Sequence, residues 1–229
     1  MRGIAEAQSS TRLTAMRRLI HLVLSPHSRL VRLMLGEKRI ACDLAAPEDP
    51  LAHLPVLREI DGTLVTGLWA IVDHLENEHP ERPLLPADAV TRAEALRLFD
   101  WTMSNFHEQA TRRIVFEKGS QAQTGNLNRR PPDMETVRAG RLALRTILPG
   151  LGTLAETRGF LAGRDVTLAD LALAAHLSAL DYFGEVPWTE YLALGEWYAR
   201  LKSRPSFRPL LGDRVPGQPP VSHYAELDF

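Results

Sequence analysis

The segment from Leu54 to Glu76, LPVLREIDGTLVTGLWAIVDHLE, decides the fold of this chain. Two short apolar runs, at 55–59 and 63–65, flank Asp61-Gly62. Asp-Gly between apolar runs is a strong hairpin signal, because both turn positions tolerate positive φ. Helical spacing of apolar residues then resumes over 69–77. The segment therefore predicts two antiparallel strands followed directly by a helix.

The residues before this segment predict a small β-α-β unit. Residues 18–24 (RLIHLVL) suit a buried strand, and after a Ser-Pro break Ser28 is placed to cap a helix that ends by about Lys38. A short apolar run at 40–44 follows at once, so a right-handed crossover to a parallel strand is expected. Only residues 45–53 then remain before Leu54. That length leaves no room for another helix at this point.

The chain beyond the linker PERPLLP (80–86) predicts helices and no strand. We expect long helices over 87–118 and 133–157, with a loop at 121–132 between them. In VTLAD (166–170), Thr167 stands three residues before Asp170, which is the spacing of a capping box. We therefore interpret this pair as a structural cap and not as an acid-base pair. The helix that follows is apolar nearly all round and should be buried.

A further helix is expected over 191–204, where Pro205 stops it, and the tail from Phe207 is too rich in proline and glycine for regular structure. These patterns divide the chain into four parts. The parts are a disordered extension at 1–15, a first domain at 16–85, an all-helical domain at 86–208 and an extended C-terminal tail at 209–229.

Composition excludes several classes of protein. Of the 229 residues 45% are hydrophobic, the net charge is −1 and Cys42 is the only cysteine. Near-neutral charge gives no field for nucleic acid or anionic lipid, and one cysteine excludes a disulfide framework. No apolar run is long enough for a signal peptide or a membrane span. We expect a cytoplasmic protein without membrane insertion, nucleic-acid binding, metal or cofactor.

Isolated reactive side chains have structural interpretations. His21 and His176 have no second and third ligand at helical or hairpin spacing, so we interpret both as core or interface residues. Cys42 lacks a neighbour in sequence that would stabilise its thiolate. Four tryptophans occur without an interleaved basic stripe, which favours packing over base stacking. They are Trp69, Trp101, Trp188 and Trp197.

Several strings together resemble the glutathione S-transferase superfamily over residues 17–208. They are SPHSRLVRLMLGEKRI (25–40), LPVL before the hairpin, LVTGLWAIVDHLE and GRDVTLADLALAAHLSAL (163–180). The resemblance implies an α+β two-domain fold, with a thioredoxin-like domain that has a shortened second-helix segment and an all-α C-terminal domain. It also implies that Pro55 is the cis-proline of the fold.

The C-terminal strings resemble a narrower group, the FtsZ-binding division regulators of alphaproteobacteria. They are LDYFGEVPWTEY (180–191), EWYARLKSRPSFRPLLGDRVPG (196–217) and HYAELDF (223–229). This resemblance implies a cytoplasmic homodimer at the division site. It would bind FtsZ filaments and promote their curvature and stability during constriction, and it would not be an enzyme.

The glutathione cleft departs from the superfamily pattern. Ser25 matches the position of a thiolate-stabilising hydroxyl, and Leu54 and Pro55 match the cleft floor. Thr66-Gly67 stands where members that hold glutathione usually carry an acid followed by serine. Loss of a charged acceptor removes a hydrogen bond of a class worth roughly 1.5 to 3 kcal/mol. We interpret the cleft as a remnant, and two alternatives stay open: a glutathione-dependent transferase that uses Ser25, and a small-molecule binding module.

Two surfaces are candidates for partner contact. One is the charged turn that contains Arg112 and Glu117, for which a solvated surface is the simpler interpretation. The other is the end of the tail, where apolar anchors stand beside an acid and suit an extended segment that docks in a groove. The alternative is that its aromatic residues fold back onto the helical domain. The tail candidates are Tyr224, Leu227, Asp228 and Phe229.

Overall fold

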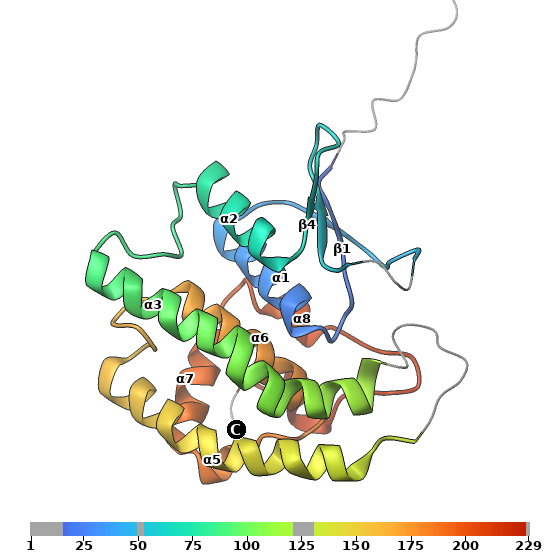
Figure 1. Ribbon diagram of the computed structural model, residues 1–229, viewed down its shortest axis with the longest axis vertical. Coiled ribbons are helices and arrows are strands. Elements are labelled where there is room, and N and C mark those ends of the chain that lie inside the picture. Colours follow the sequence, from blue (N-terminus) through green and yellow to red (C-terminus); the bar gives the residue numbers. More distant parts are fainter. Residues whose placement is uncertain (1–15, 50–52, 121–130, 228–229) are drawn as a thin grey trace, which may run out of the picture.

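A computed structural model describes residues 16–49, 53–120 and 131–227 (Figure 1). Its first part is a four-stranded sheet in the order β2-β1-β3-β4. β1 and β2 are parallel, and the other neighbouring pairs are antiparallel, as the hairpin and crossover predict. The strands are β1 Arg18–Ile20, β2 Asp43–Ala45, β3 Val56–Arg58 and β4 Leu64–Thr66.

The alternation of side chains between the two faces of the sheet fixes the register of these short strands. Leu19 of β1 is opposite Leu44 of β2 on one side and Leu57 of β3 on the other. Leu19 and Leu57 are fully buried, whereas Leu44 is 48% exposed at the sheet edge. The central strands therefore carry the apolar contact with the helices, and β1 is shorter than the predicted 18–24.

Helix α1 (Pro26–Lys38) follows β1, and its N-cap is Ser25, not the predicted Ser28. The difference arises because the Ser25 hydroxyl accepts a hydrogen bond from the Ser28 N–H at 3.4 Å, while Pro26 occupies the first helical position, which needs no donor. Arg39 ends the helix with φ 57. The Ser-Pro break thus belongs to the helix start.

The connection from β2 to β3 contains no helix in its described residues, 46–49 and 53–55. The Leu54–Pro55 peptide bond is cis, as the resemblance implied. After the hairpin, helix α2 (Leu68–Glu78) begins directly beyond Gly67. The shortened second-helix segment predicted from the sequence is therefore present.

The remaining chain forms a helical body below the sheet in Figure 1. The predicted helix over 87–118 is one continuous rod, but its second half is a wider π-helix, a change that apolar spacing does not show. The helical segments are α3 Ala89–Trp101, η1 Thr102–Ser120, α5 Met134–Arg158, α6 Leu168–Tyr182, η2 Trp188–Glu190, α7 Leu192–Lys202, α8 Arg208–Leu211 and η3 Ser222–Ala225.

Helix α6 is the centre of the molecule. Each of its residues is buried, as its uniform apolar character predicts, and it packs against α1, α3 and η1. The α1 contact joins the sheet-containing part to the helical body. A side chain on α6 can therefore contact groups from both parts.

The tail differs from its prediction of irregular structure. It contains the short helices α8 and η3 and an isolated bridge between Val215 and Gln218. Pro209 lies in the first turn of α8, where a proline is tolerated, so the prolines of the tail do not prevent short helices. The predicted extension at 1–15 and most of the predicted loop at 121–132 lie outside the described residues.

Candidate functional site

Ser25 is the N-cap of α1, the position at which the superfamily resemblance predicts the glutathione cleft. Its oxygen accepts the Ser28 N–H, and the Ser28 hydroxyl in turn accepts the Leu22 N–H at 3.3 Å. Both serines therefore stabilise the turn between β1 and α1 by accepting hydrogen bonds from its main chain. Because the cap uses only a lone pair of the Ser25 oxygen, its hydroxyl proton stays available, so the capping role and the hydroxyl-donor role are compatible at this residue.

The opposite wall of the cleft is closed to the amino-acid end of glutathione. Gly67 has φ 89, and its N–H donates to the Pro55 carbonyl at 2.9 Å. The His53 ring lies 3.2 Å from the position that a Cβ on Gly67 would occupy. Thr66 offers an exposed hydroxyl and no charge. The Gly67 N–H is thus already bonded, and neither Thr66 nor Gly67 offers a charge to the amino-acid end of the tripeptide.

Three histidines that sequence spacing did not connect meet in this region. They are His27 in the first turn of α1, His107 in η1 and His176 in α6. Each comes from a different element, so only the packing of α1, η1 and α6 reveals the group. His176 was interpreted from the sequence as a lone core residue, and the structure gives it two histidine neighbours.

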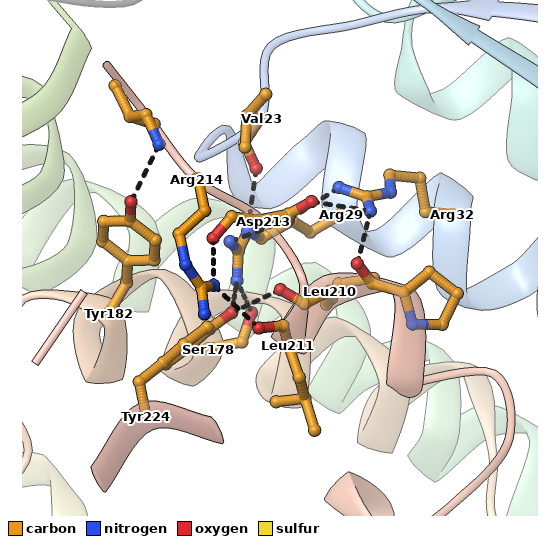
Figure 2. A network of polar contacts seen from close by, with 12 residues as sticks. Val23, Arg29, Arg32, Ser178, Tyr182, Leu210, Leu211, Asp213, Arg214 and Tyr224 are labelled. Carbon is orange, nitrogen blue, oxygen red and sulfur yellow. Dashed lines mark hydrogen bonds and ion pairs between the residues drawn. The ribbon is translucent and has the colours of Figure 1, made fainter. Parts of the chain in front are cut away.

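Arg29 organises a second candidate site, the C-terminal latch, which we define as Arg29, Arg32, Ser178, Asp213 and Tyr224 (Figure 2). The Arg29 guanidinium is fully buried. Its Nη1 donates to the Ser178 hydroxyl and the Tyr224 hydroxyl, both at 2.8 Å, and its Nη2 donates to Asp213 at 3.1 Å. One buried cation thus connects α1, α6 and the tail.

The remaining contacts of the latch place one carboxylate between two guanidinium groups and satisfy the other donors with neutral oxygens. Arg32 donates to both oxygens of Asp213, at 2.8 and 2.9 Å, and Arg29 donates to the Val23 carbonyl. Tyr224 donates to the Leu210 carbonyl at 2.9 Å. A buried charge with this number of partners is satisfied, whereas removal of one partner leaves the others unpaired.

More of the tail is held beside the latch. Tyr182 donates to the Gln218 carbonyl and accepts the Val215 N–H, and the Val221 N–H donates to the Tyr182 carbonyl. His223 lies 3.5 Å from the buried carboxylate of Asp181. The tail up to η3 is therefore bound to the helical body.

These contacts change the list of partner candidates. Tyr224 is fully buried and Glu117 is 8% exposed, with its carboxylate accepting the Asp133 N–H at 2.9 Å. Both were predicted as partner contacts, and both serve the interior instead. Arg112 is exposed and pairs with Glu108 at 3.1 Å, and Leu227 is 43% exposed. Asp228 and Phe229 lie outside the described residues.

The predicted cap is present at the start of α6. Asp170 accepts the Thr167 N–H at 2.9 Å and the Thr167 hydroxyl at 2.8 Å. The same carboxylate accepts the Leu161 N–H and the Trp197 indole N–H, which the sequence did not indicate. All of these groups are inside the protein, so the pair is structural.

The other candidates from the sequence are also accounted for. Burial raises the pKa of the Cys42 thiol to about 11, which keeps it protonated and unreactive. Trp188 and Trp197 are buried, but Trp69 is 55% exposed and differs from the expected packing role. Among the described helices, none is both long and apolar enough to cross a membrane.

Comparisons with known proteins agree with this architecture. Residues 19–83 match the family model of the glutathione S-transferase N-terminal domain. FtsZ-localized protein A of Caulobacter vibrioides is 42% identical over 93% of this chain and 98% of its own length. Maleylacetoacetate isomerase of Dictyostelium discoideum is 28% identical over 75% of each chain.

Two solved structures are similar to nearly the whole chain. A glutathione S-transferase from Rhodospirillum rubrum has a TM-score of 0.87 at 41% identity, and FzlA from C. crescentus has 0.86 at 41%. Each alignment covers 93% of this chain and 100% of the other. The chain therefore belongs to the glutathione S-transferase superfamily and, within it, to the family of FtsZ-localized protein A.

Proposed function

We propose that this chain is a non-enzymatic cell-division regulator that binds FtsZ filaments as a homodimer and promotes their curvature and stability. The observation that carries the proposal is the 42% identity to FtsZ-localized protein A across 93% of the chain. The state of the cleft supports it. No acid stands at Thr66, and the Gly67 N–H is bonded to Pro55, so the acting surface is the exterior.

The tail supports the same role through its anchoring. The latch holds Tyr224 in the interior, and the chain then emerges with Leu227 exposed. A segment that is fixed next to its binding residues loses less conformational entropy on docking than a tail that is fixed nowhere. We propose that residues 226–229 dock on FtsZ and that Arg112 adds a peripheral charged contact.

A dimer would use the exposed apolar side chains beside the sheet. Leu64 of β4 is 60% exposed and Trp69 of α2 is 55% exposed. The Trp69 ring lies 4.8 Å from the buried ring of Phe99 in α3, so one side of Trp69 packs against the helical body while the other is exposed. Exposed apolar patches of this kind mark association sites. Two copies would double each weak filament contact, which gives preference for the polymer over the single subunit.

A direct test is co-sedimentation with FtsZ from the same organism. The chain should pellet with GTP-assembled FtsZ and stay in the supernatant with unassembled, GDP-bound FtsZ. Trp69→Glu should yield a monomer by light scattering and weaken pelleting by tenfold or more, while Trp69→Phe should retain both. Absence of pelleting by the unmodified dimer would contradict the proposed role.

A glutathione-dependent transferase is the second candidate, favoured by Ser25 at the N-terminus of α1 and by the similarity to maleylacetoacetate isomerase. It predicts retention on immobilised glutathione and turnover of a generic electrophile that is lost in Ser25→Ala. The division regulator predicts neither. A binding module without chemistry would show retention and no turnover.

A further inference from the structure

The histidine cluster, His27, His107 and His176, brings three imidazoles to one point. One nitrogen from each ring lies within 4.8 Å of the other two. The ring centroids are separated by 4.9 Å for His27 and His107, 5.4 Å for His107 and His176, and 6.3 Å for His27 and His176. Among the described residues these are the ones whose arrangement could hold a metal ion.

Each ring of the cluster has one buried nitrogen without a hydrogen-bond partner in the described chain. His27 Nε2, His107 Nδ1 and His176 Nε2 are buried and have no hydrogen-bond partner among the described residues. A buried polar atom without a partner costs about 1 to 3 kcal/mol, so three together are unusual unless something satisfies them jointly. A single cation at the centre would do so.

His176 is held in the orientation that this role requires. It is fully buried, and its Nδ1 is 3.0 Å from the Thr111 hydroxyl. That contact fixes the ring and leaves Nε2 directed at the other two histidines. Metal-binding histidines usually have such a support on their second nitrogen. His27 and His107 are only half-buried, which provides a route for an ion from solvent.

The electrostatics keep the cluster in its metal-binding protonation state. Burial, and then the charge of His107, lower the pKa of His27 to about 4. Burial also lowers the pKa of His107 and, more strongly, that of His176. All three rings are therefore neutral near pH 7, and neutral imidazole is the form that binds metal.

We propose that His27, His107 and His176 form a site for one divalent transition-metal ion of the Zn²⁺ class, with a fourth position open to water. Imidazole nitrogens suit Zn²⁺, Co²⁺ and Ni²⁺, whereas Mg²⁺ and Ca²⁺ prefer oxygen. Tetrahedral Zn²⁺ bonds of about 2.0 to 2.1 Å place ligand nitrogens about 3.4 Å apart. The half-buried rings of His27 and His107 must therefore rotate inward on binding, while Thr111 holds His176.

The site lies at the cleft that no longer fits glutathione. His27 is two residues from Ser25, and His53, whose ring covers Gly67, is close enough to His27 to lower its pKa. The proposed site is thus close to residues that the sequence analysis assigned to the glutathione cleft. Metal binding here is independent of FtsZ, so it can be tested without any filament assay.

The test uses the full chain without a polyhistidine tag, stripped with chelator and titrated calorimetrically with Zn²⁺. We expect one ion per chain, and for Co²⁺ the intense visible bands of a four-coordinate ion. His107→Gln should weaken Zn²⁺ binding by about 100-fold or more, and Thr111→Val by about 10-fold. His79→Gln removes a histidine that lies outside the cluster, and it should leave the affinity unchanged.

Two further measurements protect the test against variants that fail to fold. His27→Gln changes a half-buried residue and should act like His107→Gln, and Zn²⁺ should raise the melting temperature of the unmodified chain but not of either variant. The proposal is wrong if Zn²⁺ affinity is the same in His107→Gln and the unmodified chain. It is equally wrong if Co²⁺ gives only the weak spectrum of a six-coordinate surface ion.

Discussion

At the scale of single residues, Arg29 is the residue that connects the C-terminal tail to the interior of the protein. It is fully buried, and its hydrogen bonds reach a main-chain carbonyl, a serine, a tyrosine and an aspartate. A charge is tolerated inside a protein only when its donors are satisfied in this way. The tail is therefore part of the folded core up to Tyr224, and the same contact limits which tail residues can reach a partner.

The latch predicts graded losses of stability. Tyr224→Phe removes one acceptor for Arg29 and one donor to Leu210, so the free energy of unfolding should fall by about 1 to 2 kcal/mol. Arg29→Met leaves Asp213 and Tyr224 without this partner and should cost about 3 to 5 kcal/mol. Urea denaturation measures both. Arg112→Met, at an exposed pair, is the control and should change stability by less than about 0.5 kcal/mol; equal losses in all three would contradict the latch.

His21 predicts a dependence of stability on pH. Burial, and then the charge of Arg32, lower its pKa from 6.5 to about 4 in the folded chain. Between these values the unfolded chain binds the extra proton, so stability falls as the pH drops below 6.5. At pH 5 the loss from this residue is about 2 kcal/mol. Denaturation at pH 7.5 and 5 should show a smaller pH-dependent loss in His21→Gln, and an unchanged loss would show that His21 does not contribute.

At the scale of elements, the start of α6 is held by several hydrogen bonds to one carboxylate, that of Asp170. Asp170 accepts hydrogen bonds from Thr167, from Leu161 in the preceding segment and from Trp197 in α7. The capping box therefore also fixes how α6 lies against its neighbours. Because α6 contacts both the sheet-containing part and the helical body, the position of its first turn affects how these two parts pack together.

Asp170→Ala should lower the free energy of unfolding by about 3 kcal/mol or more. The loss combines a missing cap, about 1 kcal/mol, with buried donors on Thr167, Leu161 and Trp197 that have no acceptor. Asp165→Ala, an exposed acid in the same loop, is the matched control and should be nearly neutral. A loss below about 1 kcal/mol in Asp170→Ala would mean that the network adds nothing to the cap.

The elements also show which features could be predicted from the sequence and which could not. The hairpin around Asp61-Gly62, the cap at Thr167 and the buried α6 were predictable, because each depends on residues close in sequence. The π-helical half of the long helix was not, since its apolar spacing resembles that of an α-helix. The latch and the histidine cluster could not be predicted from the sequence either, because their residues come from different elements that meet only in the folded chain. The burial of Tyr224 agrees with the alternative that the tail aromatics fold back, and the sequence could not choose between the two because the Arg29 partner of Tyr224 is far away in sequence.

At the scale of the whole molecule, the proposed role depends on what lies outside the latch. Deletion of residues 226–229 leaves Tyr224 and its contacts in place, so the fold should be unaffected while filament binding weakens several-fold. Asp228→Lys should act in the same direction. The matched control is Asp165→Lys, the same charge reversal at an exposed acid in the loop before α6, which should leave filament binding unchanged. Full binding by the deletion variant would remove the tail from the proposed filament surface.

The central claim is that the scaffold acts through its exterior and not through a glutathione cleft. The most direct measurement is the fraction of the chain that pellets with GTP-assembled FtsZ as its concentration increases, with and without millimolar glutathione. We predict saturable pelleting with the same midpoint in both conditions. Absence of pelleting, or a midpoint that glutathione shifts, would contradict the account.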